Sequence, residues 1–542
     1  MRIILPYFAV VILKLRIMRG LFKTVSCLAL AMLAGCSEDS GWHSPDVDPA
    51  GSRIPHEMIV LGKKLDDPYS VKNVTKALES LYPTKADRVD VTPTDVYVRF
   101  LPKTEAEYQK LVDAGYDLMD HPLDYQILQD GDYYHDPALD EEDITWQYAV
   151  IPHGEAFPEG VEYEVLDDCY IPESGTRSED GIDWEAVERE SFRLTGNEMC
   201  LAPVTRGSAE KPSGRVTVID DEANGGQPFG VSGVTVVCNV FVKFATAYTD
   251  RDGYYKMDRK FSAKPRYRLM FKNKEGFAIG FNKVIAPASM SALGQGAPSG
   301  MDVTVTKDSD VKLWRRTVVN NAAYDYIARC GEGDMNITRP PKNLRIWIFK
   351  NATASSAVMM RQGAVIDNAL VRSFLGDYAG LLKSFLPDIT LGLKDQMSYS
   401  SIYSETCHEL AHASHFAQAG KSFWDKYIKF ILTSFVSTGG VTYGTGAESD
   451  AGYCEVGEMW GYYMQNAMYH DRYGGTMPVV GMSYWFHPQI FRYLEERGMT
   501  RSQIFSVLKK DVDDRETLKM KLLESFPGKA AVIQQVFDRY AK

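Results

Sequence analysis

The spacing of apolar residues changes along the chain and divides it into regions of different predicted structure. In the first region, apolar residues at helical spacing predict a helix over residues 71–81, and alternating apolar residues predict a strand over residues 96–100. Thr104 and Glu107 have the spacing of a capping box and predict the start of a second helix. We therefore expect a small α/β domain over residues 54–173.

The next regions have little helical periodicity. Residues 174–212 are charged and irregular, with one short helical pattern around Trp184 to Leu194, and are interpreted as a connector. Residues 213–306 contain short alternating strands divided by Asp and Gly turns, which predicts a β domain. The aromatic and acidic stretch Asp124 to Trp146 could form a binding surface, but packing between small strands and loops is the interpretation that we favour.

The last region, residues 307–542, is mostly helical in pattern. Two apolar runs in it, Leu344 to Phe349 and Asp388 to Leu393, predict strands that precede a long helical segment. From Glu448 to the C-terminus, apolar residues recur at the spacing of successive packing helices. The chain of 542 residues is too long for one core, and we expect a multidomain α+β protein with a helical C-terminal domain.

The N-terminal residues have the pattern of an export signal. Arg19 and Lys23 precede a short apolar run from Val25 to Met32, which predicts a signal peptide over residues 1–35. The following Leu33-Ala34-Gly35-Cys36 resembles a bacterial lipobox, which implies that Cys36 is lipidated and anchors the protein to the membrane. Residues 36–53 are polar and are expected to form the tether.

Two further features bear on where the protein acts. Ser37-Glu38-Asp39-Ser40 resembles the acidic export signal of surface lipoproteins in some Gram-negative bacteria, which implies an outer membrane lipoprotein exposed on the cell surface. The formal net charge is −12, and the signal segment contributes five basic residues and no acidic one. The mature protein is therefore more acidic still, and no nucleic acid partner is expected.

The cysteines predict no disulfide framework. Of the eight, Cys27 lies in the signal segment and Cys36 is the predicted anchor. The other six show no C-x-x-C spacing, although an oxidising compartment would permit disulfides. Cys407 and Cys454 flank the two segments that carry the candidate metal ligands, and we assign no bond between them.

The segment with the strongest chemical signal is His408-Glu409-Leu410-Ala411-His412, which matches H-E-x-x-H. It lies in a stretch without Gly or Pro until Gly420, so a helix is predicted, and residues four apart on a helix face the same side. His408 and His412 are thus candidate Zn²⁺ ligands, and Glu409 is the candidate general base. His415 continues the same face, and we expect it to be packed or to support a ligand.

A third metal ligand must come from another segment. The predicted helix from Tyr453 to Met468 offers two carboxylates one turn apart, Glu455 and Glu458. The ligand helix has to approach the motif helix closely, and Glu458 has the small residues Gly461 and Cys454 beside it on its face. We assign Glu458 to the metal and expect Glu455 to hydrogen-bond a ligand histidine, with the exchanged assignment as the alternative.

These residues resemble a known class of enzyme. H-E-x-x-H with a downstream glutamate helix is similar to gluzincin-type zinc metallopeptidases over about residues 310–542, and E-x-W-G around Glu458 is similar to a helix of lipoprotein zincins. No G-x-x-H follows His412, which disfavours a metzincin. The resemblance implies a zincin-like domain over residues 307–542 that hydrolyses peptide bonds with a zinc-bound water activated by Glu409. Oxyanion donors would come from Tyr443, Tyr484 or His487.

The β domain also resembles a known module. Gly233-Val234-Thr235-Val236 and Thr249-Asp250-Arg251-Asp252-Gly253-Tyr254 are similar to the signature of carboxypeptidase regulatory-like β-sandwiches over residues 213–306. This resemblance implies a spacer or a module that presents substrate. Asp250 and Asp252 could bind calcium, but an Asp-Gly turn explains them more simply.

We therefore expect a zinc-dependent peptidase on the bacterial cell envelope, acting on peptides or proteins. The alternative is a surface lipoprotein that binds a substrate or host protein and has an inactive zincin-like domain. The presence of Glu409 favours catalysis, because a scaffold that only retained zinc would not require a base at that position.

Overall fold

The computed structural model describes most of the chain in several stretches. These are residues 58–84, 89–140, 143–172, 181–203, 209–280, 288–331, 335–349, 355–364, 386–438, 443–475, 481 and 483–540. The described residues divide into two compact units, one within Asp46–Asn321 and one within Ala322–Lys542. About 36% of the residues are helical and 24% are in strands, with the helices concentrated toward the C-terminus. The fold is thus multidomain and of the general α+β class, as predicted.

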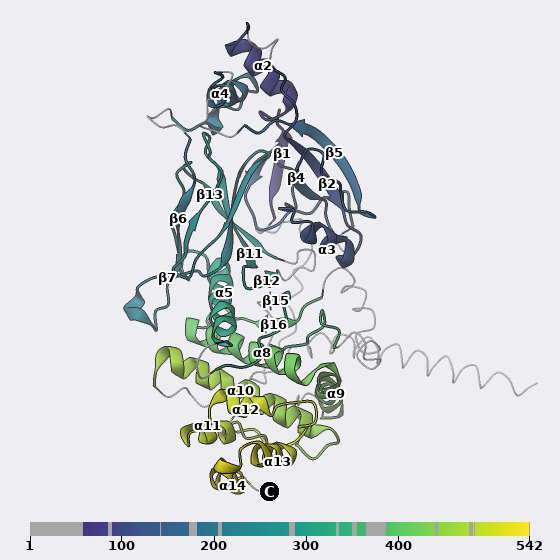
Figure 1. The fold of residues 1–542 in the computed structure, drawn as a ribbon, viewed down its shortest axis with the longest axis vertical. Coiled ribbons are helices and arrows are strands. Elements are labelled where there is room, and N and C mark those ends of the chain that lie inside the picture. The colour runs from purple at the N-terminus through teal and green to yellow at the C-terminus, as the bar shows by residue number, and fades with distance from the viewer. Residues whose placement is uncertain are drawn as a thin grey trace, which may run out of the picture. The chain divides into compact units, whose positions relative to one another are not determined.

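The unit Asp46–Asn321 begins with a small mixed region (Figure 1). Its elements are β1 (Val60–Lys64), α2 (Val71–Leu81), β2 (Asp95–Leu101), α3 (Glu105–Asp113), β3 (Tyr125–Gln129), β4 (Gln147–Pro152), β5 (Glu162–Cys169) and α4 (Trp184–Leu194). Strand β2 lies between β4 and β5 in an antiparallel sheet, and β1 pairs with β3. Thr104 caps α3 by accepting a hydrogen bond from the backbone N–H of Glu107 at 3.2 Å, as the sequence predicts.

Helix α4, which was predicted as the one regular element of a connector, belongs to a hydrophobic core. Val74 and Leu78 of α2 pack with Trp184 and Val187 of α4. A fully buried carboxylate on α4, Glu188, accepts hydrogen bonds from Tyr69 at 2.5 Å, Lys243 at 2.8 Å and Ser262 at 2.8 Å. The three donors satisfy a charge that would be costly to bury alone.

The rest of this unit is built from strands in two groups. They are β6 (Ser213–Val218), β7 (Phe229–Gly230), β8 (Val234–Val240), β9 (Lys243–Tyr248), β10 (Tyr254–Lys256), β11 (Arg266–Asn273), β12 (Phe277–Gly280), β13 (Met290–Gln295) and β14 (Val303–Val305). Strand β6 pairs with β7, β10 and β14, whereas β11 pairs with β8, β12 and β13, and β8 pairs with β9. The described part of residues 213–306 is therefore built mainly of strands, joined by turns and one short 3-10 helix, Asn224–Gly226.

The Asp-Gly turn before β10 accounts for the two aspartates that were weighed as calcium ligands. One oxygen of Asp250 accepts hydrogen bonds from the backbone N–H groups of Asp252 and Tyr254, both at 2.9 Å. Gly253 has a φ of +85°, and a Cβ there would lie 2.1 Å from the carbonyl oxygen of Val216. The turn therefore requires glycine, and Asp250 stabilises the turn backbone.

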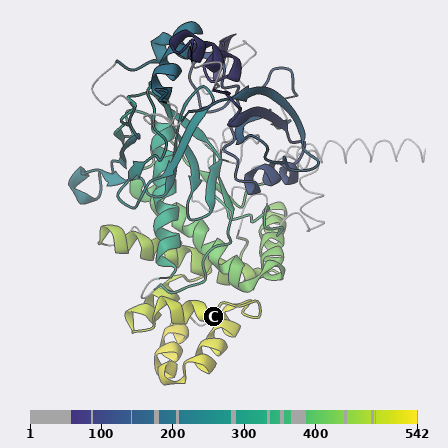
Figure 2. The same cartoon turned by 45° about the horizontal axis from the view of Figure 1, so that its top comes forward.

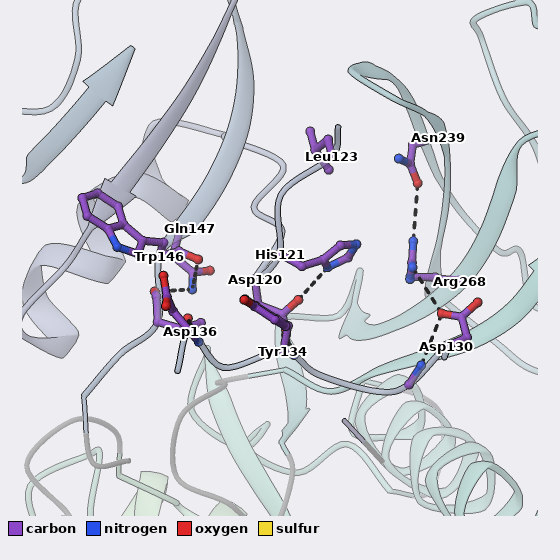
Figure 3. Close-up of polar contacts among 12 residues, drawn as sticks. Asp120, His121, Leu123, Asp130, Tyr134, Asp136, Trp146, Gln147, Asn239 and Arg268 are labelled. Atoms are coloured by element: carbon purple, nitrogen blue, oxygen red, sulfur yellow. Dashed lines mark hydrogen bonds and ion pairs between the residues drawn. The ribbon is translucent and has the colours of Figure 1, made fainter. Parts of the chain in front are cut away.

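The acidic and aromatic stretch Asp124 to Trp146 is used for packing, as favoured from the sequence. Asp130 pairs with Arg266 at 3.0 Å and, more weakly, with the buried Arg268 at 3.4 Å. Figure 3 shows Asp130 and Arg268 in line with Asn239, and His121 with Asp120 beside them. These contacts join the loop to strands β8 and β11.

The second unit contains the helices of the C-terminal region (Figures 1 and 2). Its elements are β15 (Leu344–Phe349), β16 (Ile389–Gly392), α8 (Tyr399–Ala419), α9 (Lys421–Thr438), α10 (Ala451–Tyr473), α11 (Gln489–Glu496), α12 (Arg501–Ser506), α13 (Arg515–Ser525) and α14 (Ala530–Asp538). Helix α5 (Val311–Arg329) crosses the boundary between the units. Strands β15 and β16 are parallel neighbours, and both coincide with the apolar runs singled out in the sequence.

Helix α8 contains the H-E-x-x-H segment and lies against α10 (Figure 1). Ser398 caps its N-terminus by accepting the backbone N–H of Ser401 at 3.2 Å, and Gly420 ends it with a φ of +83°. The glycine that was predicted to terminate the motif helix does so, because its φ is in the left-handed region.

Several predictions concern residues at the N-terminus. The signal segment, Cys36 and the tether lie outside the described residues. Among the described helices, none is both long and apolar enough to span a membrane. All six cysteines of the described residues are free, including Cys407 and Cys454.

Candidate metal site

The two motif histidines face the same point. His408 and His412 lie one turn apart on α8, and their side chains are 2% and 1% exposed. Their Nε2 atoms are 2.9 Å apart. Burial lowers the pKa of His412 well below its ordinary value, and the nearby imidazoles of His408 and His415 lower it further. A buried neutral imidazole is the form that binds a metal.

Glu458 of α10 completes a cluster with these histidines. Its Oε2 lies 3.6 Å from Nε2 of His408 and 3.8 Å from Nε2 of His412, and its side chain is fully buried. Within the described residues, this is the one group of three or more His, Cys, Asp or Glu side chains whose ligand atoms lie within 4.8 Å of one another. The cluster could therefore hold a metal ion, and it contains the three residues that the sequence nominates as ligands.

The close approach of α10 to α8 depends on a glycine. A Cβ on Gly461 would lie 2.8 Å from Cε1 of His412 and 2.9 Å from both Cε1 and Nε2 of His408. Any larger residue would press on both imidazoles, because carbon atoms pack at about 3.5–4.0 Å. The argument from small residues that selects Glu458 in the sequence thus matches the packing.

Two residues outside the cluster hydrogen-bond to its side chains. Gln465, two turns beyond Glu458 on α10, has its Oε1 3.1 Å from Nδ1 of His408. An amide oxygen accepts a hydrogen bond from Nδ1–H, which leaves the Nε2 lone pair directed at the cluster. Tyr427 of α9 donates a hydrogen bond from its hydroxyl to Oε1 of Glu458. The other carboxylate oxygen, Oε2, is the one that faces the histidines.

Glu409 lies next to the cluster without belonging to it. It is fully buried, and among the described residues no side chain donates a hydrogen bond to either of its oxygens. Burial raises its pKa well above the ordinary value, and the charges of Glu458 and Glu405 raise it further, whereas the backbone N–H of Ala357 opposes the rise. A carboxyl group in this position beside the two imidazoles could exchange a proton with a group bound at the cluster.

An extended segment runs beside the motif helix. Ser356 pairs with Thr390 of β16 through two antiparallel backbone hydrogen bonds of 2.8 and 2.9 Å. The next residue, Ala357, accepts a hydrogen bond of 2.9 Å from the indole N–H of Trp424 on α9. The same indole packs against His412, with ring centroids 5.6 Å apart. Trp424 of α9 therefore contacts both the extended segment, through Ala357, and the motif histidine His412.

The orienting role predicted for Glu455 is wrong. Its carboxylate accepts the backbone N–H of Arg515 at 3.2 Å and lies 3.4 Å from Nε of the same residue. Glu455 therefore joins α10 to the start of α13, and the partner of a ligand histidine is Gln465 instead. Glu455 projects from α10 toward α13, where the N-terminus of that helix attracts a carboxylate.

His415 behaves as a packed histidine. It is fully buried, and its ring lies 4.7 Å from that of Phe423 and 5.9 Å from that of Trp424. Burial lowers its pKa to about 3. It is not part of the three-residue cluster, as expected from the sequence.

The structure separates the three candidate oxyanion donors. The hydroxyl of Tyr443 lies 3.3 Å from that of Tyr462, whose ring packs 4.6 Å from His408. Tyr484 packs on both tyrosines. His487 instead packs 4.8 Å from Tyr540 near the C-terminus. Tyr443 and Tyr484 therefore belong to an aromatic group that reaches the cluster through Tyr462.

Sequence reasoning missed Gln465, Tyr427 and Tyr462. Gln465 had a detectable signal, since it follows Glu458 by seven residues and so lies on the same helix face. Tyr427 had none, because the face that α9 presents to α10 depends on tertiary packing. Comparisons with protein-family models, curated proteins and solved structures found no match for this chain.

Proposed function

We propose that this protein is a zinc-dependent peptidase of the gluzincin type. The observation that supports this function best is the convergence of His408, His412 and Glu458 on one buried point, with the carboxylate of Glu409 beside it. Two imidazoles, one carboxylate and an adjacent base form the donor set of a catalytic zinc site.

The distances within the cluster suit zinc. A tetrahedral zinc ion with ligand bonds of about 2.0–2.1 Å separates its donor atoms by about 3.3 Å. The three separations in the cluster, 2.9, 3.6 and 3.8 Å, lie on both sides of that value. His408, His412 and Glu458 would hold the ion, and small side-chain rotations would bring the donors to equal distances.

The chemistry follows from the positions of the surrounding residues. When bound, zinc lowers the pKa of water to about 7 and polarises a carbonyl oxygen. Glu409 accepts the proton of the attacking water and then passes it to the amine that leaves when the peptide bond breaks. Gln465 and Tyr427 keep His408 and Glu458 oriented throughout.

The remaining parts of the chain fit an envelope protein. We propose that residues 307–542 form the zincin-like domain and residues 213–306 a carboxypeptidase regulatory-like β-sandwich. The lipobox ending at Cys36 supports an outer membrane lipoprotein on the cell surface. Replacing Cys36 by alanine should abolish lipid labelling and release the protein from the membrane fraction, and unchanged partition would contradict the lipoprotein assignment.

The direct test of the function is Glu409→Gln. The change keeps the size of the side chain but removes its ability to take a proton. We expect the purified variant to retain the parent's zinc content by elemental analysis and its melting temperature. Its hydrolysis of casein or a peptide library should fall by about 10²–10⁴-fold.

The chelator is the control for this test. Hydrolysis by the parent should stop when a chelator removes zinc and return when zinc is restored. Near-parental cleavage by Glu409→Gln would contradict the role of that residue. A protein that binds zinc but cleaves no peptide would favour the alternative, a binding lipoprotein with an inactive zincin-like domain.

A further inference from the structure

A third carboxylate lies on the same face of α8 as the catalytic residues. Glu405 precedes His408 by three residues, Glu409 by four and His412 by seven. Side chains at these intervals are neighbours on a helix. The charge of Glu405 accordingly contributes to the raised pKa of Glu409. It is thus an acidic group one helical turn from the proposed base.

The carboxylate is held in place from the side of the extended segment. Ser355 donates a hydrogen bond from its hydroxyl to Oε1 of Glu405. The same hydroxyl accepts a hydrogen bond of 3.1 Å from the backbone N–H of Gly392, at the end of β16. Because a hydroxyl has one proton, accepting from Gly392 leaves that proton for Glu405. The contact therefore fixes one carboxylate oxygen beside the segment of Ser356 and Ala357.

Glu405 differs from its neighbours in exposure. His408, Glu409, His412 and Glu458 are all buried, whereas Glu405 retains partial exposure. Ser356, the next residue on the adjoining segment, is also partly exposed. Within the described residues, no basic side chain forms an ion pair with Glu405. Glu405 is thus the one carboxylate of this group whose residue retains exposed surface.

The proposed reaction does not require this third carboxylate. Zinc with two charges would balance Glu458 and Glu409, so an ionised Glu405 would add one further negative charge. Burial raises the pKa of Glu405, whereas the hydrogen bond from Ser355 and the charges of His408 and Lys394 oppose that rise. A negative charge that is partly desolvated attracts a cation more strongly than one in bulk water. The packing of α8 does not require a charged residue at this position either, because a neutral side chain with a carbonyl oxygen could accept the hydrogen bond from Ser355.

We propose that Glu405 binds a cationic group of the substrate next to the scissile bond, so that the enzyme selects peptides with a protonated amine or guanidinium at that position. The inference rests on the proposed peptidase function. Two groups share this chemistry, the free α-ammonium of a peptide and the side chain of Lys or Arg. The first would make the protein an aminopeptidase, and the second an endopeptidase with a basic preference.

The structural alternative is that Glu405 only ties the extended segment to α8. Two variants separate these roles. Glu405→Gln keeps a carbonyl oxygen that can accept from Ser355 but removes the charge. Ser355→Ala keeps the charge but removes the tether. The informative quantity is the ratio of kcat/KM for a cationic peptide to that for its neutral counterpart, since a general loss of activity cancels from it.

The substrates are matched pairs of peptides. One pair differs only in acetylation of the N-terminus, and the other has Lys replaced by norleucine at each position near the cleaved bond. We expect the parent to favour the cationic member of one pair by about 10- to 100-fold, the value of a hydrogen bond to a charged group. Glu405→Gln should reduce that ratio to about one, and Ser355→Ala should retain most of it.

A binding measurement complements the kinetics. Glu409→Gln loaded with zinc should bind the favoured peptide more tightly than its neutral counterpart, and adding Glu405→Gln should remove the difference. If the parent cleaves peptides in a chelator-sensitive way but shows no cationic preference, the inference is wrong and the peptidase function stands. A preference that survives Glu405→Gln also overturns it. If no peptide is cleaved, the proposed function fails and the inference fails with it.

Discussion

The substitution Gly461→Ala adds one methyl group at the point where α10 meets both motif histidines. In the native packing that methyl carbon would lie 2.8 Å from Cε1 of His412 and 2.9 Å from Cε1 of His408. The contacted atoms belong to two rings that are themselves fixed, one of them by the hydrogen bond from His408 to Gln465. Neither imidazole can yield without changing the direction of its Nε2 atom.

The size of the effect follows from these distances. Carbon atoms pack comfortably at about 3.5 Å, so relieving a contact of 2.8 Å requires a movement of about 0.7 Å. Metal sites tolerate ligand displacements of about 0.2 Å. Since the required movement is several times larger, we expect zinc affinity to fall by at least the 10- to 100-fold that an outer-sphere substitution causes. The fold should survive, because overpacking lowers the free energy of unfolding by about 1–3 kcal/mol, and the higher helix propensity of alanine offsets about 1 kcal/mol of this loss.

Gly457→Ala is the matched control on the same helix. A Cβ at Gly457 would lie 3.5 Å from Cδ2 and Cε2 of Tyr427, which is ordinary contact. This variant should bind zinc like the parent and be more stable by up to about 1 kcal/mol. Zinc affinity would be measured by competition with a chromogenic chelator, and stability by urea denaturation of the metal-free proteins. Parental zinc affinity in Gly461→Ala would refute the assignment of the two histidines as neighbouring ligands.

Three other predictions test the surroundings of the site and the distant buried ion pair. Gln465→Ala should lower zinc affinity by about 10–100-fold in the same chelator competition, since the tautomer of the first motif histidine is no longer fixed. Glu458→Ala should be nearly free of zinc by elemental analysis, whereas Glu455→Ala should stay loaded; the reverse would exchange the two assignments. Glu188→Gln should destabilise its unit by about 3–5 kcal/mol in urea denaturation at pH 7, because the buried ammonium of Lys243 loses the opposite charge of Glu188.

The Glu188 prediction also has a definite pH dependence. Burial by itself raises the pKa of Glu188, but the charge of Lys243 and hydrogen bonds from Lys243, Tyr69 and Ser262 outweigh it, so the pKa lies below its ordinary value. A depressed carboxylate stabilises the native state above the unfolded pKa of about 4.3 and loses that contribution as the pH falls through the folded pKa. The stability difference between parent and Glu188→Gln should therefore shrink as the pH falls below about 4.

The sequence predicts best those helices and strands whose apolar pattern lies within the element itself. Strand β15, Leu344–Phe349, coincides with its apolar run because a buried strand needs no partner information to be recognised. Helix α4, Trp184–Leu194, agrees in both bounds, but its packing on α2 was not predicted. Periodicity reports which face of a helix is apolar and does not report which element covers that face.

The limits of sequence reasoning are clearest at Glu455 and Glu458. Both lie in one predicted helix, and the choice of Glu458 as the candidate ligand followed from the need for a small residue, Gly461, between the helices. The partner of Glu455 could not be found in that way, because Arg515 lies sixty residues further along the chain at the start of another helix. Long-range polar partners are set by the tertiary fold, and a single sequence contains no local trace of them.

The candidate ligands and their outer partner on α10 nevertheless follow one rule that the sequence does contain. Glu458, Gly461 and Gln465 are separated by three and four residues and form one stripe of α10. Each contributes differently to the contact with α8. Glu458 places a carboxylate beside the histidine nitrogens, and Gly461 leaves room for the two imidazole rings. Gln465 provides an amide oxygen for Nδ1 of His408. A helix that faces a metal motif is therefore best examined as a stripe, in which a glycine and a neutral polar residue are as informative as the ligand.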